Sequence, residues 1–195
     1  MKIYTYHANV EDYNWFDTID DKDIWFYKKL AGKPIKSEWH EVKIQPIDDD
    51  EGKKISIGDF LTIGSGYTPI FSEKAVKSFT NHLKYKGEFL KMSSTDKSFY
   101  VFNVTNFIDI LDESQSIAVR YDNKIARITH YHFLKNIINE KELIFKIPQL
   151  PLQQVFVTDL FIKLANEYNL KGLDCKIIWD NGPLPVTPRD IITVI

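Results

Sequence analysis

The stretch that decides the fold is residues 72–104, SEKAVKSFTNHLKYKGEFLKMSSTDKSFYVFNV, which joins a helical pattern to a strand pattern. It opens on Ser72, whose hydroxyl can accept a hydrogen bond from a free backbone N–H group at a helix N-terminus. The apolar residues that follow on one helical face are Val76, Phe79 and Leu83. Gly87 is placed to end the helix, and the last six residues, FYVFNV, are of the types that favour strands. The stretch therefore predicts an amphipathic helix packed against a sheet.

A second helix has the same pattern, beginning at Thr158 and Asp159 and ending before Gly172. Its apolar face consists of Leu160, Phe161, Leu164, Ala165 and Tyr168. Strand-like runs occupy residues 2–6, 39–47, 99–104, 117–121, 125–129, 143–147 and 173–179. Asp122-Asn123-Lys124 predicts a hairpin turn between two of these runs. We predict one α+β domain over residues 1–195, with a mixed, mostly antiparallel sheet of roughly six to eight strands and two to four packed helices.

The composition favours a folded chain in a reducing compartment. Of the 195 residues, 44% are hydrophobic and 14% aromatic, which is ample material for a core. The one cysteine, Cys175, can form no intramolecular disulfide. Residues 1–17 lack the continuous apolar segment of a secretory signal, and no run approaches the ~20 apolar residues of a membrane-spanning helix. We therefore expect a cytoplasmic protein with no membrane anchor.

The distribution of charge argues against nucleic acid as a partner. The formal net charge is −2, and residues 1–70 carry nine lysines against thirteen carboxylates. Residues 71–195 are slightly basic, with sixteen cationic and fourteen acidic residues. Because no long Lys/Arg stripe is present, the electrostatic pattern expected for binding a phosphate backbone is missing.

The residues that most often carry chemistry do not form a recognised motif. His130 and His132 are two apart, so on a strand both rings would lie on one face, as in some metal sites and acid–base pairs. No third ligand at a recognised spacing accompanies them, and the sequence contains neither HExxH nor CxxC. Gly64-Ser65-Gly66 lacks the lysine of a phosphate-binding loop, and Cys175 sits in an apolar run typical of a buried strand. We predict no catalytic residue, no cofactor and no metal ion.

The acidic run Asp48, Asp49, Asp50 and Glu51 is the candidate partner-binding segment. Complementary charge speeds encounter with a basic protein and fixes the orientation of the complex. Consecutive like charges are also typical of a solvated loop, and the sequence leaves both interpretations open. Residues 91–97 are a second loop on which a specificity surface is plausible.

Short landmarks in a fixed order connect this chain to a known family. They are Gly58-Asp59-Phe60, Pro69-Ile70-Phe71-Ser72-Glu73-Lys74-Ala75-Val76, Gly87-Glu88-Phe89-Leu90, Tyr100-Val101-Phe102-Asn103-Val104-Thr105, Asp109-Ile110-Leu111-Asp112-Glu113-Ser114, Ile144-Phe145-Lys146-Ile147-Pro148, Val155-Phe156-Val157-Thr158-Asp159, and Gly172-Leu173 ahead of Trp179. In order and spacing they resemble the immunity proteins of bacterial polymorphic toxin systems, a myxobacterial-type family first catalogued as a domain of unknown function. The resemblance spans about residues 58–180.

The resemblance implies a non-enzymatic cytoplasmic protein that binds and neutralises a cognate toxin, encoded by a neighbouring gene. The landmark residues themselves have structural interpretations: Gly58 and Gly172 as turn or cap positions, Ser72 and Thr158 as helix caps. The expected core residues are Phe71, Phe102, Phe145 and Phe156.

The sequence leaves two alternatives open. The first is an enzyme with a non-standard site, for which the residues to inspect are His130, His132, Asp109 and Asp112. The second is an adaptor or chaperone for a secreted effector, which would bind a protein without blocking its toxicity.

Overall fold

The computed structural model describes residues 1–23, 26–47, 56–63, 68–95, 97–135 and 137–180. Within these ranges the α-helices are α1 (Glu73–Leu83) and α2 (Asp159–Glu167), and the short 3-10 helices are η1 (Asp21–Asp23) and η2 (Phe26–Lys29). The strands are β1 (Lys2–Thr5), β2 (Trp15–Thr18), β3 (Val42–Ile47), β4 (Phe60–Leu61), β5 (Ile70–Ser72), β6 (Gly87–Ser94), β7 (Lys97–Val104), β8 (Ile117–Tyr121), β9 (Lys124–His130), β10 (Ile144–Phe145), β11 (Phe156–Thr158) and β12 (Lys176–Asp180).

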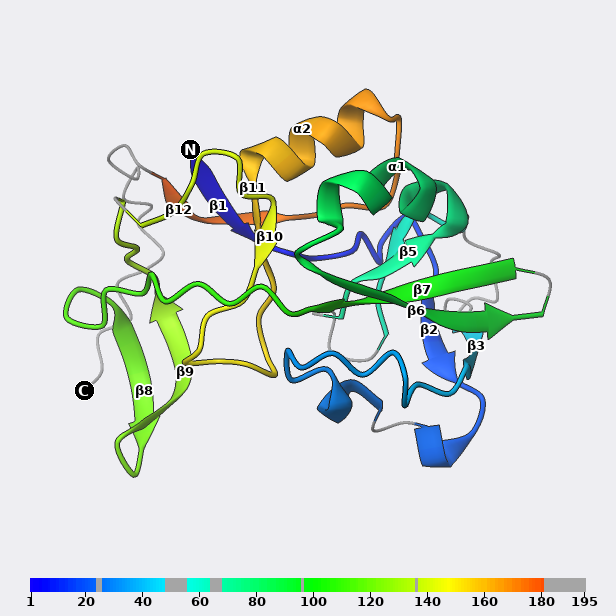
Figure 1. The fold of residues 1–195 in the computed structure, drawn as a ribbon, viewed down its shortest axis with the longest axis horizontal. Helices are drawn as coiled ribbons and strands as arrows, with labels where there is room; N and C mark the ends of the chain where they lie inside the picture. The colour runs from blue at the N-terminus through cyan, green and yellow to red at the C-terminus, as the bar shows by residue number, and fades with distance from the viewer. Residues whose placement is uncertain (24–25, 48–55, 64–67, 96, 136, 181–195) are drawn as a thin grey trace.

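These strands form three sheets. The larger two have the strand orders β2-β3-β6-β7-β5-β4 and β10-β11-β1-β12, and the third is the β8–β9 hairpin. Helix α1 lies over β5 and β7 of the first sheet, and α2 lies over β1 and β11 of the second (Figure 1). Among the described strand pairs only β3–β6 is parallel. The α+β class with mostly antiparallel pairing is confirmed.

The strands differ from the prediction in number and in one long element. Twelve strands are present among the described residues, more than the six to eight expected, because several are only two or three residues long. Elements as short as β4 and β5 show no periodicity in a sequence. Strand β6 was not predicted, because its first residue, Gly87, is of the type that commonly ends a helix.

Helix α1 begins as predicted but ends differently. The Ser72 hydroxyl accepts a hydrogen bond from the Ala75 N–H at 3.1 Å and donates one to Asp59 Oδ1 at 2.7 Å. The helix ends at Leu83, so the interpretation of Gly87 as its terminator is wrong. Gly87 instead packs against β7, where a Cβ atom would lie 2.3 Å from the Asn103 carbonyl oxygen.

Helix α2 corrects two further expectations. Thr158 occupies the N-cap position, as predicted, but its hydroxyl donates to the Glu142 carbonyl at 2.6 Å and forms no side-chain cap hydrogen bond. The left-handed residue after the helix is Asn169, with φ 52°, so Gly172 is not the cap. Gly172 also has a positive φ, 98°, and a Cβ there would lie 2.4 Å from the Phe60 carbonyl oxygen.

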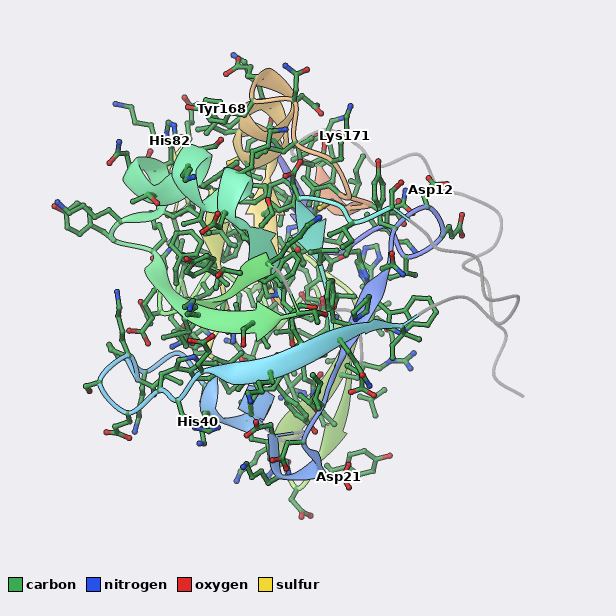
Figure 2. The ribbon with its side chains drawn as sticks, turned by 90° about the vertical axis from the view of Figure 1, so that its right-hand side faces the viewer. Asp12, Asp21, His40, His82, Tyr168 and Lys171 are labelled. Carbon is green, nitrogen blue, oxygen red and sulfur yellow. The ribbon has the colours of Figure 1, made fainter. Side chains whose placement is uncertain are left out.

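The two helices share one aromatic core. The rings of Phe79 in α1 and Phe161 in α2 have centroids 4.8 Å apart. At the solvent edge of the same contact, His82 Nε2 and the Tyr168 hydroxyl share a 2.9 Å hydrogen bond (Figure 2). The phenylalanines predicted to be in the core, Phe71, Phe102, Phe145 and Phe156, are all buried. The core prediction is confirmed.

The predicted hairpin is also confirmed. Asp122 and Asn123 both adopt positive φ, 48° and 62°, and Tyr121 pairs with Lys124 across the two-residue turn. This is the turn geometry that matches the twist of the flanking strands. One face of the hairpin packs on the protein through Ala118, Ile125 and Ile128.

Candidate protein-binding surface

The β8–β9 hairpin forms no ladder with the two larger sheets in the described part of the chain, and it lies away from both helices (Figure 1). On its outer face, β8 presents three apolar side chains: Ile117 is 64% exposed, Val119 44% and Tyr121 72%. Alternate residues of a strand point to the same face, so these three side chains form a stripe. Such a stripe costs solvation free energy unless a partner covers it.

Positive charges border the apolar stripe. Val119 pairs with Arg127, and Tyr121 pairs with Lys124, and both cationic residues are exposed. Directly paired residues in an antiparallel ladder share a face. We call the five residues Ile117, Val119, Tyr121, Lys124 and Arg127 the hairpin patch. Its chemistry suits a partner surface that combines apolar and acidic groups.

A neighbouring charge on β8 is already neutralised. Arg120 donates from Nη2 to Glu113 Oε2 at 2.6 Å, which holds the pKa of the Glu113 carboxyl below its ordinary value. The pair is solvent-exposed, so it adds little stability. Lys124 and Arg127 thus remain the cations that the patch offers to a partner.

The side-chain face of the hairpin is better suited to binding than its backbone edge. In the described part of the chain β8 pairs with β9 alone. The ladder shifts register twice, between Ile117 and Ala118 and between Val119 and Arg120. Register irregularities of this kind bend an edge and disfavour the addition of another strand. We therefore assign the candidate function to the hairpin patch.

The acidic partner-binding candidates are not tested by this geometry. Asp48, Asp49, Asp50 and Glu51 lie outside the described residues. The interpretation of residues 91–97 as a loop is wrong for most of that segment. Residues 91–94 belong to β6, and Lys97 begins β7.

The four residues named for an enzyme site have separate roles. His130 is exposed at the end of β9, opposite Ile117. The Asp112 carboxylate accepts hydrogen bonds from Ser114 and Gln115, which close a local turn and lower its pKa. Asp109 Oδ1 accepts from Gln149 Nε2 at 2.9 Å. The backbone carbonyl of His132 accepts a hydrogen bond from the Asp112 N–H at 2.8 Å.

Metal-ligating side chains do not cluster among the residues described. No group of three or more His, Cys, Asp or Glu side chains is placed to hold an ion there. His40 instead meets the buried Asp23 carboxylate at 2.8 Å. Burial raises the pKa of Cys175 to about 11, so its thiol stays protonated at neutral pH. Among the described helices, none has the length and apolar character needed to cross a membrane.

Comparison with known proteins adds no relative. No protein-family model matches the chain, and no curated protein sequence matches it.

The sequence predicted the hairpin but not its exposed face. The run Ile117-Ala118-Val119-Arg120-Tyr121 alternates large apolar side chains, the pattern of a half-buried strand. That pattern predicts burial of the three large residues. The structure places them outside and turns the smaller Ala118 towards the core, so only the three-dimensional arrangement reveals the surface.

Proposed function

We propose that this chain is an immunity protein, which binds a cognate bacterial toxin through the hairpin patch and neutralises it. The observation that carries the proposal is the stripe of Ile117, Val119 and Tyr121, left exposed on a hairpin outside the main sheets. The ordered landmark residues supply the choice of partner class, since they resemble toxin immunity proteins.

The patch has the composition of an interface centre. Tyr and Arg are enriched among the residues whose truncation most weakens protein complexes. Tyr121 supplies a large rigid surface with few rotatable bonds. Lys124 and Arg127 border the apolar stripe, where complementary charge raises the association rate and fixes orientation.

Neutralisation by occlusion requires no catalytic group in the binding protein. The binder must hold a rigid surface over the toxin's active site or its target-binding site. A two-residue turn with both central residues in the left-handed region fixes the hairpin, and Ala118, Ile125 and Ile128 anchor its inner face. The outer face is thereby presented in one orientation.

The test is co-expression with the toxin-like protein encoded by the neighbouring gene. We expect the full chain to restore growth of cells that express this toxin, and to co-purify with it in a fixed stoichiometry. A complex that forms without restoring growth would contradict neutralisation and favour an adaptor role. Failure of both rescue and complex formation would reject the proposal.

A further inference from the structure

A cavity of about 530 Å³ lies against β9 of the hairpin, where Arg127 and Ile128 form part of its wall. Its walls come from η2, from β7, from β9 and from the chain before β11. The residues that line it are Tyr27, Leu30, Thr68, Pro69, Phe102, Arg127, Ile128, Lys146, Leu152, Gln153, Gln154 and Val155. A volume of this size is typical of small-ligand sites.

Lys146 places a buried positive charge in this cavity. The residue is 5% exposed, and its ammonium donates to the Leu30 carbonyl at 2.7 Å and to the Pro151 carbonyl at 2.9 Å. An ammonium has three N–H donors, and in the described part of the chain the third has no partner. No carboxylate there forms an ion pair with it. A buried charge without a counter-ion is costly, and an anion bound in the cavity would offset that cost.

The protonation state of Lys146 fits this role. Burial lowers the pKa of its amine to about 8, because the charged form loses solvation. The group is therefore still largely an ammonium at neutral pH.

Two other polar side chains in the cavity wall can also bind a ligand. The Gln154 side-chain oxygen is buried and has no hydrogen-bond partner among the described residues, so it can accept from a ligand N–H or O–H group. Arg127 adds a second cation at the mouth. The apolar side of the cavity is formed by Leu30, Pro69, Phe102, Ile128 and Val155.

We propose that this cavity binds a carboxylate joined to an apolar body and an adjacent N–H donor, the chemistry of an N-acylated apolar amino acid. The carboxylate accepts from Lys146 and Arg127, the N–H donates to Gln154, and the apolar side chain covers Phe102 and its neighbours. The C-terminal residue of a peptide carries the same three groups. The inference does not depend on the toxin-binding role.

The cavity and the hairpin share residues and a hydrogen bond. Arg127 belongs to the hairpin patch and to the cavity wall. Next to it, Gln153 Nε2 donates to the Ala126 carbonyl of β9 at 3.1 Å. A ligand held by Lys146 and Gln154 therefore lies against β9 of the hairpin.

The probe is N-acetyl-L-phenylalanine, titrated into the full chain by calorimetry at pH 7. The matched ligand control is N-acetyl-L-phenylalaninamide, which keeps the apolar body and the N–H but lacks the charge. We expect the acid to bind at least about tenfold more tightly than the amide, since hydrogen bonds to a charged group are the stronger ones. Equal binding of the two, or no binding of the acid, would overturn the proposal.

Variants locate the binding. Lys146→Met keeps an unbranched apolar stem but removes the charge, and should weaken acid binding about tenfold or more; Arg127→Met should weaken it to a smaller extent. Lys163→Met, on the exposed face of α2, should bind as the parent chain does. Arg127→Met keeps the test decisive if Lys146→Met fails to fold, since it changes an exposed residue. Acid binding that survives unchanged in both cavity variants would place the ligand elsewhere and reject the site.

A third ligand distinguishes the two sources of this chemistry. N-acetyl-Ala-Ala-Phe carries the same terminal residue on a longer chain. Tighter binding than the single residue identifies peptide C-termini as the occupant, and exclusion of the longer chain identifies free acids. Either result supports the shared site, provided that Lys146→Met weakens it.

Discussion

Two residues, Gly172 and Asp59, determine how the loop after α2 contacts the six-stranded sheet. The Lys171 carbonyl accepts from the Asp59 N–H at 2.8 Å and from the Phe60 N–H at 2.9 Å, while the Lys171 N–H donates to Asp59 Oδ2 at 3.0 Å. The approach is close because Gly172 has no Cβ and holds φ at 98°. An L side chain rarely adopts this backbone conformation.

Gly172→Ala should therefore destabilise the protein by about 2 kcal/mol or more, through both the strained φ and the clash with Phe60. Urea denaturation followed by circular dichroism measures the change. The control is Lys171→Ala, which changes an exposed side chain and keeps the backbone contacts, and should stay within about 0.5 kcal/mol. Equal stability of both variants would contradict the assigned role of Gly172.

Lys146 predicts a pH dependence of stability with a definite sign. Its folded-state pKa, about 8, lies below the ordinary lysine value of 10.5. Between these values the unfolded chain binds more protons than the folded one, so the lysine's contribution to stability rises with pH. From pH 7 to pH 10 the gain is roughly 2 kcal/mol.

Other titrating groups oppose this rise in stability with pH, so the free energy of unfolding must be compared between the parent chain and a variant. Burial raises the pKa of Cys175 to about 11, and a thiol with a raised pKa loses stability as pH climbs above its unfolded value. Comparing the parent chain with Lys146→Met at pH 7 and pH 10 cancels the contribution of Cys175. A stability difference that does not move between the two pH values would show that the lysine is not desolvated as described.

At the scale of elements, the contact between α1 and α2 holds the two main layers together. Phe161 of α2 packs on Phe79 and lies within 5.7 Å, centroid to centroid, of Phe60 in β4. Both helices therefore depend on one aromatic cluster. We expect Phe161→Ala to cost about 3–5 kcal/mol.

The measurement is again urea denaturation, with Tyr85→Ala as the matched aromatic truncation. Tyr85 is 83% exposed, so its removal should cost less than about 0.5 kcal/mol. If Phe161→Ala were as mild as Tyr85→Ala, the aromatic cluster would not join the layers.

The elements also show what the sequence could predict. The cap at Ser72 and the hairpin turn at Asp122-Asn123 were predictable because their chemistry is local to a few residues. The roles of Gly87 and Gly172 were not, because each is determined by a distant carbonyl, of Asn103 and of Phe60. A glycine that ends a helix and a glycine that lies against a distant carbonyl have the same sequence pattern.

The candidate sites, too, depend on contacts that are not local in the sequence. The sequence contains Lys146 within an apolar run, but nothing local says that its amine meets the carbonyls of Leu30 and Pro151. Likewise, the outward turn of Ile117, Val119 and Tyr121 depends on which face of the hairpin packs on the core. Both surfaces arise from long-range packing, which a single sequence does not encode visibly.

At the scale of the whole molecule, the scaffold and the proposed binding surface are separate. The landmark phenylalanines of the predicted core are buried residues on strands of the two larger sheets. The hairpin patch lies on a third, two-stranded sheet (Figure 1). A surface of this kind can change its sequence without disturbing the core, as partner specificity requires. We therefore expect substitutions in the patch to alter binding and leave folding intact.

The most direct test of the central claim compares two exposed tyrosines by affinity for the neighbouring-gene toxin. Tyr121→Glu changes the patch, and Tyr85→Glu makes the same change at a site as exposed but remote in sequence. Loss of one central aromatic contact costs 2 kcal/mol or more in many interfaces, so we predict that Tyr121→Glu weakens binding about 30-fold or more. Tyr85→Glu should bind within about twofold of the parent chain. Unchanged toxin affinity in a folded Tyr121→Glu variant would contradict the assignment of the hairpin patch.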